Sequence, residues 1–295
     1  VFGGRTFFTR GWPGSPHAGL YVREAEGAER HLAGPVIPRG ATTPAGSPQE
    51  TAAVRNFWPA PDGQRVLILE AASGNSFGSL RLVDVRTGRL LAIVTGETHN
   101  GMTSVAWLPD GSRFAYTQTD RQGERTPVGS RTVLYAIDGG EQTIAIPPIE
   151  DLPGRHLVQT VHAATDRPRL IVELTTGASG SNEVRLVDLD TPRPTVKKLF
   201  ASGSRWLLVG ARGDDAWFIT DSDAPRGRVV KAAGLGGGTP EPQHRRARRQ
   251  GRDRRRELGG RKRLWALRRP AADASGNGRC RRRGASGATS PATVE

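Results

Sequence analysis

The sequence predicts an all-β fold, a β-propeller of about four and a half four-stranded blades followed by a disordered Arg-rich tail. Three observations support the propeller: strand-turn-strand motifs return at intervals near 50 residues, Gly and Pro turns bound short apolar runs, and no helical segment separates them. One four-stranded blade cannot bury both of its faces, so blades stack around an axis. A β-sandwich also has turn-bounded strands, but it does not explain the period.

The clearest repeat is a strand, a P-D-G turn and a second strand. The segment FWPAPDGQRVLIL (57–69) realigns on VAWLPDGSRFAYT (105–117) with an offset of 48, which superposes Arg65 on Arg113. Pro and Gly set the turn backbone, and β-branched and aromatic residues follow the turn. Each segment therefore predicts a hairpin of one blade.

A second repeat has its own spacing. GSLRLVDVRTGRLL (78–91) resembles NEVRLVDLDTPRP (182–194) at an offset of 104, and GLYVREAEGAERHL (19–32) resembles VLYAIDGGEQTIAI (133–146). In chain order these motifs predict five units, the last of them incomplete. The units are approximately 1–48, 49–100, 101–153, 154–200 and 201–233.

The basic charge is concentrated after residue 233. The whole chain has a formal net charge of +14, and residues 234–295 hold 16 Arg and 1 Lys against 5 acidic residues. Such a segment, low in hydrophobicity and high in charge, is expected to be disordered. Its Arg, Ala, Gly and Pro bias is also what a GC-rich coding sequence gives in a shifted frame, so a frameshift, a genuine basic arm and an engineered tail are the three interpretations.

Residues Gly74-Asn75-Ser76-Phe77-Gly78 fit the G-x-S-x-G pattern of serine hydrolases. A nucleophile elbow needs a strand before the serine and a helix after it. The segment SLRLVDV after Ser76 alternates as a strand does, so we expect a polar hairpin loop and no catalytic role.

The other candidate groups give no constellation. The histidines have no H-x-x-x-H or H-E-x-x-H spacing, which gives no indication of a helical metal site, and His162 lies in a strand beside a turn. Neighbouring residues of a strand point to opposite faces, which argues against a carboxylate dyad at Glu150-Asp151 or Asp214-Asp215. We therefore expect no metal, no cofactor and no catalytic residue in this chain. The histidines are His17, His31, His99, His156, His162 and His244.

Cysteine content and hydropathy exclude two further classes. A single cysteine, Cys280, excludes an internal disulfide. No apolar run reaches the ~18 residues of a membrane span, so no membrane partner is expected. The chain begins at Val1 inside an expected strand, which suggests an internal fragment, and the compartment stays open between cytoplasm and periplasm.

About 230 residues of the chain resemble the N-terminal propeller of prolyl oligopeptidases, serine endopeptidases that cleave short peptides after proline. The resemblance rests on GLYVRE, VRNFWPAPDGQRVLI, TSVAWLPDGSRFAYT, NEVRLVDLD and, most specifically, DDAWFITDSDAPRGRVVKA (214–232). It implies a seven-bladed propeller that sits as a lid on an α/β-hydrolase domain and restricts access to its active site.

The resemblance also implies which residues to expect at the site. The family's catalytic Ser, Asp and His lie in the hydrolase domain, so this chain is expected to be inactive alone and its partners to be that domain and short proline-containing peptides. The residue five places before Trp107 lines the substrate pocket in the family, and here it is Met102, where an aromatic residue is more usual.

The alternative function is a stand-alone propeller that binds other molecules, with the basic tail as a nucleic-acid-binding arm. Single-strand binders interleave aromatic residues for stacking, and the tail has one, Trp265. Nucleic acid is therefore not the expected partner.

Overall fold

The computed structural model confirms the all-β class. It describes residues 1–11, 17–36, 52–72, 74–122, 126–146, 157–176, 180–190, 194–201, 203–235 and 242–243. The chain divides into two compact units, Val1–Arg246 and Ala247–Glu295, and everything described below belongs to the first unit. Almost all of the expected tail, Cys280, Trp265, His156, His244 and Glu150-Asp151 lie outside the described residues.

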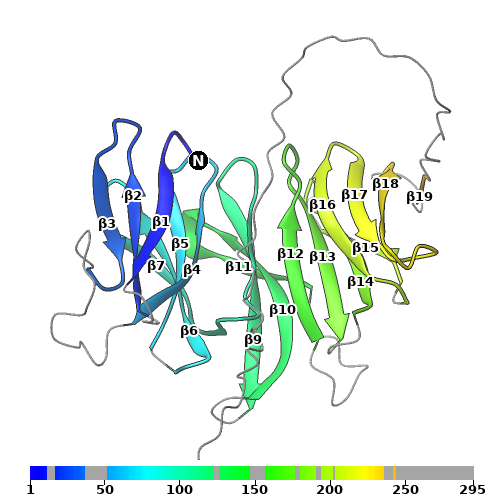
Figure 1. The fold of residues 1–295 in the computed structure, drawn as a ribbon, viewed down its shortest axis with the longest axis horizontal. Coiled ribbons are helices and arrows are strands. Elements are labelled where there is room, and N and C mark those ends of the chain that lie inside the picture. Colours follow the sequence, from blue (N-terminus) through cyan, green and yellow to red (C-terminus); the bar gives the residue numbers. More distant parts are fainter. Residues whose placement is uncertain are drawn as a thin grey trace, which may run out of the picture. The chain divides into compact units, whose positions relative to one another are not determined.

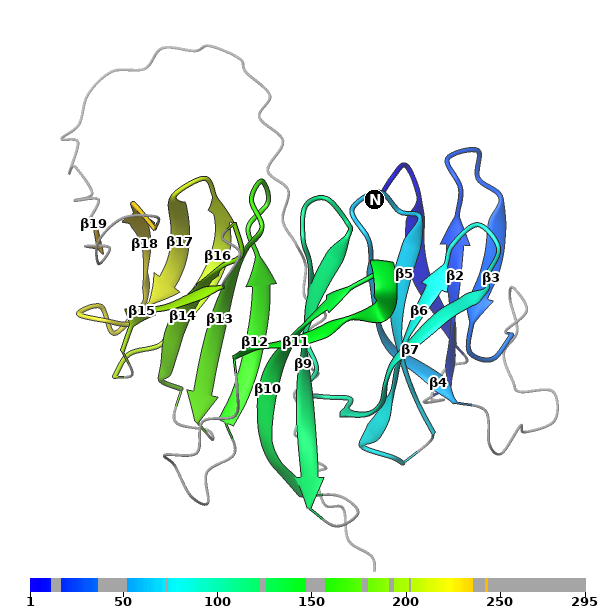
Figure 2. The same cartoon turned by 180° about the vertical axis from the view of Figure 1, so that it is seen from behind.

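Five antiparallel sheets follow one another along the chain (Figures 1 and 2). The first sheet has three strands: β1 (Thr6–Gly11), β2 (Ala18–Arg23) and β3 (Glu29–Ala33). The second has four: β4 (Ala53–Pro59), β5 (Arg65–Ala71), β6 (Phe77–Asp84) and β7 (Leu90–His99). The third has four, β8 (Val105–Trp107), β9 (Arg113–Gln122), β10 (Thr126–Ala136) and β11 (Gln142–Ile146), with a 3-10 turn, η1 (Asp138–Gly140), between β10 and β11.

The fourth sheet consists of β12 (Leu157–Ala163), β13 (Arg169–Thr176), β14 (Asn182–Asp188) and β15 (Thr195–Phe200). The fifth consists of β16 (Trp206–Arg212), β17 (Asp215–Thr220), β18 (Arg228–Ala233) and β19 (Pro242–Gln243). In each sheet the spatial order of the strands follows their order in the chain. The short β19 pairs with β18 and carries the fifth sheet past residue 233, where the sequence suggested its end. The expected unit boundaries otherwise stay predictions.

Consecutive sheets pack face to face, with one core cluster for each of the four pairs. In β5, Val66 and Ile68 belong to the cluster shared with the first sheet, whereas Leu67 and Leu69 belong to the cluster shared with the third. Alternate residues of a strand point to opposite faces, so the continuous apolar run VLIL is explained by a sheet that is covered on both sides.

The outer face of the fifth sheet is different. Leu207, Ile219 and Val229 stand opposite one another on β16, β17 and β18, and their exposed fractions are 38%, 40% and 62%. Phe218, which is next to Ile219 on β17, points to the opposite face and is buried against the fourth sheet. The described part of the chain therefore covers one face of this sheet only.

An arginine ties each of three sheets to the next: Arg5 directly before β1, Arg65 at the start of β5 and Arg169 at the start of β13. Its guanidinium donates to the carbonyl of the positive-φ glycine in the turn between the first two strands of the following sheet. The pairs are Arg5 Nη1 to Gly63 O (3.0 Å), Arg65 Nη1 to Gly111 O (3.3 Å) and Arg169 Nη1 to Gly213 O (3.1 Å). Each contact reaches a turn 44 to 58 residues further along the chain.

Arg169 makes the most buried of these ties. Its side chain is 3% exposed and binds Asp188 Oδ2 at 2.9 Å and Asp214 Oδ1 at 3.1 Å. Burial alone would raise the pKa of Asp188, but hydrogen bonds from the Asp190 amide and from Arg169 outweigh it and hold that pKa below its ordinary value. The fourth and fifth sheets are thus joined by an ion pair between the buried Arg169 guanidinium and the half-exposed Asp214, as well as by apolar packing.

Candidate functional site

Ser76 and Met102 lie in neighbouring loops at one end of the second and third sheets. Ser76 is in the connection between β5 and β6, and Met102 is in the connection between β7 and β8. Asn100 joins the loops, because its backbone amide donates to Ser76 O at 2.7 Å and its side-chain Nδ2 donates to Asn75 O at 2.8 Å. The P-D-G turns lie at the other ends of the strands.

The structure gives Ser76 the surroundings of a hairpin turn. Strand β6 begins at Phe77, directly after the serine, where a nucleophile elbow would begin a helix. The Phe77 amide donates to Asn75 Oδ1 at 2.9 Å, and Gly74 has a φ of 75°. These are the features of an Asx turn, in which Gly and Asn accept conformations that other residues avoid.

Hydrogen bonds of its own backbone hold Met102 in place. Its amide donates to His99 O at 3.2 Å, and its carbonyl accepts from Thr117 Oγ1 at 3.1 Å. The residue is half-buried. Its assignment to a substrate pocket stays a prediction, since these contacts concern the backbone and not the side chain.

Beneath this loop lies a network of buried hydroxyl groups. Thr98 and Thr117 are fully buried, and Thr98 Oγ1 lies 2.8 Å from Thr103 Oγ1. Thr103 Oγ1 donates to His99 O at 2.7 Å, and the Ser104 amide donates to Thr117 Oγ1 at 2.7 Å. Sequence reasoning missed the network, because threonine in a strand is equally well explained by its β-propensity. Its effect is to hold the loop in one conformation.

His99 is held in its neutral form. The Gly101 amide donates to His99 Nδ1 at 3.1 Å, which requires that this nitrogen carry no proton. Burial lowers the pKa of His99, and Phe77 packs against the ring edge-to-face at 5.1 Å. A neutral ring with its proton on Nε2 can donate a hydrogen bond but is not a cation near neutral pH.

His162 and the acidic pair have structural partners. His162 Nε2 lies 3.4 Å from Glu173 Oε1, and that same oxygen accepts the amide of Leu208 at 2.7 Å, across the interface between the fourth and fifth sheets. Asp214 binds Arg169, whereas Asp215 binds Lys231 at 2.8 Å, so the two adjacent carboxylates face different partners. Across the described ranges no cluster of three or more potential metal ligands occurs.

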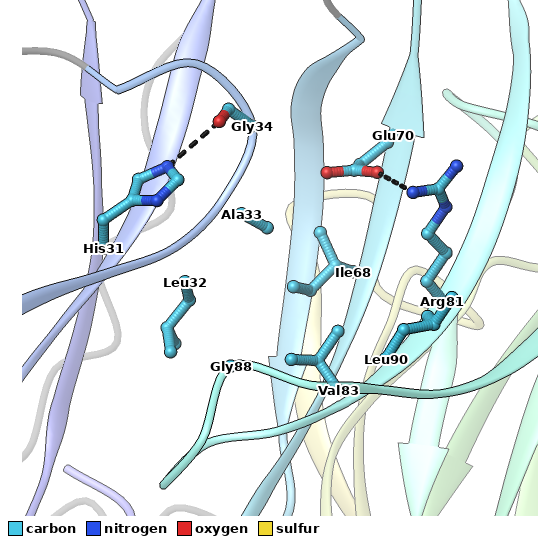
Figure 3. Close-up of a pocket in the computed structure, with 10 residues that line it drawn as sticks. All are labelled: His31, Leu32, Ala33, Gly34, Ile68, Glu70, Arg81, Val83, Gly88 and Leu90. Carbon is cyan, nitrogen blue, oxygen red and sulfur yellow. Dashed lines mark hydrogen bonds and ion pairs between the residues drawn. The ribbon is translucent and has the colours of Figure 1, made fainter.

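A second candidate site is a pocket of about 260 Å³ between the first and second sheets (Figure 3). Glu70 and Arg81 form an ion pair of 3.1 Å in its wall, and the Glu70 side chain is only 9% exposed. His31, on the opposite side, lies 3.0 Å from Gly34 O through its Nε2. Sequence reasoning did not single out this pocket. The lining residues are His31, Leu32, Ala33, Gly34, Ile68, Glu70, Arg81, Val83, Gly88 and Leu90.

Comparison with known proteins identifies the family. Residues 41–244 match the model of the prolyl oligopeptidase N-terminal β-propeller domain. The chain belongs to this family. No curated protein matches the sequence of this propeller.

Solved structures of prolyl oligopeptidases share the propeller's fold. A structure from a study of two prolyl endopeptidases and their inter-domain dynamics is 21% identical, with a TM-score of 0.61 over 79% of this chain and 33% of its own. Prolyl oligopeptidase B from Galerina marginata, in its apo form, is 14% identical, with a TM-score of 0.60 over 82% of this chain and 36% of its own. Oligopeptidase B from Leishmania major is 16% identical, with a TM-score of 0.55 over 80% and 32%. The propeller chain therefore spans about a third of the length of these neighbours.

No helix in the described part of the propeller is long and apolar enough to cross a bilayer.

Proposed function

We propose that this chain is the gating propeller of a prolyl-oligopeptidase-type serine endopeptidase that cleaves short peptides after proline. The observation that carries the proposal is the match of residues 41–244 to the family's propeller domain. In this proposal the acyl-transfer chemistry belongs to a hydrolase domain with a Ser, His and Asp triad, and the propeller acts by steric exclusion.

Steric exclusion requires a stiff wall, and the packing of the described sheets provides one. Four apolar clusters join the five sheets, and the Arg-to-Gly contacts hold the turns of neighbouring sheets together. A folded protein substrate cannot pass such a wall without breaking these contacts. A short extended peptide has a small cross-section and can pass.

The loop that carries Met102 is the part of this chain proposed to face the peptide. Its backbone is fixed by Thr117 and His99, so the Met102 side chain is presented from a rigid base. The thioether is apolar and adaptable and suits an apolar peptide side chain next to proline. Within the complete enzyme, Met102→Ala is expected to raise KM for a Gly-Pro substrate with little change in kcat, because it removes binding and not chemistry.

Two measurements test the proposed function. The chain alone, mixed with a Gly-Pro chromogenic peptide, should give no hydrolysis that a serine-directed covalent inhibitor removes. In extracts of the source cells, an antibody against this chain should capture a longer polypeptide that a serine-directed covalent probe labels. Capture of only an unlabelled polypeptide would refute the proposal.

The alternative function, a stand-alone interaction module with a nucleic-acid-binding tail, makes a different prediction. It requires that the 16 arginines of residues 234–295 bind polyanions with an affinity that falls steeply as salt is raised. A truncated chain that ends at residue 246 is the matched control. Salt-dependent binding of the full chain to single-stranded RNA, lost in the truncated chain, would favour this function.

A further inference from the structure

We propose that the pocket between the first and second sheets binds a small zwitterion, a free amino acid with an aliphatic side chain, through Glu70 and Arg81. This proposal does not rest on the proposed peptidase function. It rests on the ion pair in the pocket wall and on a comparison between two sheets of the same chain (Figure 3).

The second and fourth sheets correspond residue for residue at an offset of 104. Strands β5 and β6 pair Ile68 with Arg81, and strands β13 and β14 pair Val172 with Arg185 in the same register. The neighbouring pairs correspond in the same way along both hairpins. The fourth sheet therefore provides a reference for each position of the second.

The fold does not require a carboxylate at Glu70. The corresponding residue is Leu174, which is 2% exposed and belongs to the apolar cluster between the third and fourth sheets. Glu70 belongs to no apolar cluster among the described residues, yet it is 8% exposed and borders the pocket. A buried carboxylate is costly unless it is paired, so its presence where leucine suffices needs a local reason.

The need to neutralise Arg81 does not explain why a carboxylate lies at the buried position of Glu70. In the fourth sheet Arg185 Nε binds Glu183 Oε1 at 2.6 Å, a partner on its own strand that is more exposed than Glu70. The second sheet has Ser79 at that place, whose hydroxyl accepts from Arg81 Nε at 3.2 Å. In both sheets a carboxylate pairs with the arginine, but in the second sheet it comes from the neighbouring strand and borders a pocket.

The chemistry of the wall defines the ligand class. A carboxylate and a guanidinium 3.1 Å apart present one negative and one positive group side by side, with no net charge between them. A molecule that carries an ammonium and a carboxylate on the same carbon places one on each, with charge-assisted hydrogen bonds. Isolated cations or anions would meet a repelling group as well as an attracting one.

The other residues that line the pocket determine the size of the ligand and the kind of side chain that it carries. Ile68, Val83 and Leu90 give the pocket an apolar wall below the ion pair (Figure 3). A volume of about 260 Å³ is smaller than that of typical drug-sized sites, ~300–1,000 Å³, and suits a single amino acid. Leucine and isoleucine combine the required head group with an aliphatic side chain.

The experiment is a calorimetric titration of the full chain with L-leucine, accompanied by two blocked analogues. We expect saturable binding with a Kd of about 1 mM or tighter. N-acetyl-L-leucine lacks the ammonium and L-leucine methyl ester lacks the carboxylate, so each should bind at least ~10-fold more weakly. Absence of saturable leucine binding to the folded chain would overturn the proposal, and equal binding of either analogue would overturn the role given to the ion pair.

Two variants test whether the pocket is the site of leucine binding. The double change Glu70→Leu with Ser79→Glu reproduces the arrangement of Leu174 and Glu183 in the fourth sheet, so it should keep the thermal midpoint and abolish leucine binding. Arg185→Met, at the position that corresponds to Arg81, is the control and should leave the Kd within twofold. Leucine binding that survives in the folded double variant would show that the pocket is not the site.

Discussion

Replacing Gly63 by alanine should destabilise the chain far more than the same change at Gly111. Both glycines end a P-D-G turn, both have a left-handed φ (67° and 68°), and each carbonyl accepts an arginine of the preceding sheet. They differ in what a methyl group would meet. At Gly63 an added Cβ would lie 2.4 Å from Phe2 O, whereas at Gly111 the nearest atom is 4.0 Å away.

The magnitude follows from these distances. Alanine in a left-handed conformation costs about 1–2 kcal/mol at either position. At Gly63 the first sheet's turn must also retreat by about 1 Å to reach the 3.4 Å of ordinary contact. That movement removes the Arg5 hydrogen bond of 3.0 Å, a contact to a charged donor that is worth about 1.5–3 kcal/mol. The expected loss is therefore about 2.5–5 kcal/mol for Gly63→Ala and about 1–2 kcal/mol for Gly111→Ala.

Urea unfolding followed by tryptophan fluorescence measures the difference. Gly63→Ala should lower the midpoint by at least twice as much as Gly111→Ala, with the slopes compared to confirm that both variants unfold in the same manner. Equal midpoints for the two variants would refute the reasoning, because the backbone cost would then be the whole effect and contact between the turns of the first and second sheets would contribute nothing.

Three further outcomes follow from the structure. Arg169→Met should cost about 1.5–3 kcal/mol in urea unfolding because it removes charge-assisted hydrogen bonds from a buried guanidinium to Asp188 and Asp214, whereas Arg167→Met, which removes a 42% exposed partner of the same Asp214, should cost below ~1 kcal/mol. His99 has a pKa below its ordinary 6.5 in the folded state, so the folded state binds fewer protons than the unfolded state. The stability that this difference gives above pH 6.5 should be lost as the pH falls. Over that pH range the thermal midpoint of His99→Gln should therefore fall less than that of the natural chain. Ser76→Ala should change the unfolding free energy by less than ~0.5 kcal/mol, and a larger loss would contradict its place in a hairpin loop outside the apolar clusters.

Local structure was predictable because it depends on neighbouring residues. The hairpins around Pro61-Asp62-Gly63 and Pro109-Asp110-Gly111 follow from turn chemistry, and both form as the repeat indicates. The strand after Ser76 follows from alternation, and it excludes the nucleophile elbow that the five-residue motif suggested.

The contacts between sheets were not predictable in the same way. The repeat aligned Arg65 with Arg113, but nothing in the sequence shows that Arg65 reaches Gly111 in the next sheet. The hydroxyl network under Met102 and the pocket at Glu70 depend equally on residues that are distant in sequence. Short β19, separated from β18 by a polar Gly-rich segment, had no apolar alternation to reveal it.

A repeat protein provides its own reference for separating structural residues from specialised ones. A residue that the fold demands recurs at the equivalent place, as the arginines that bind the next turn do in the first, second and fourth sheets. A departure at an exposed place costs little and carries little information. Glu70 departs at a buried place, where its counterpart Leu174 completes an apolar cluster, and the departure coincides with a pocket. Burying a charge where the same fold elsewhere buries leucine lowers stability unless something offsets it; Arg81 pairs with Glu70 at 3.1 Å, and a bound ligand that places an ammonium on the same carboxylate adds a second offset.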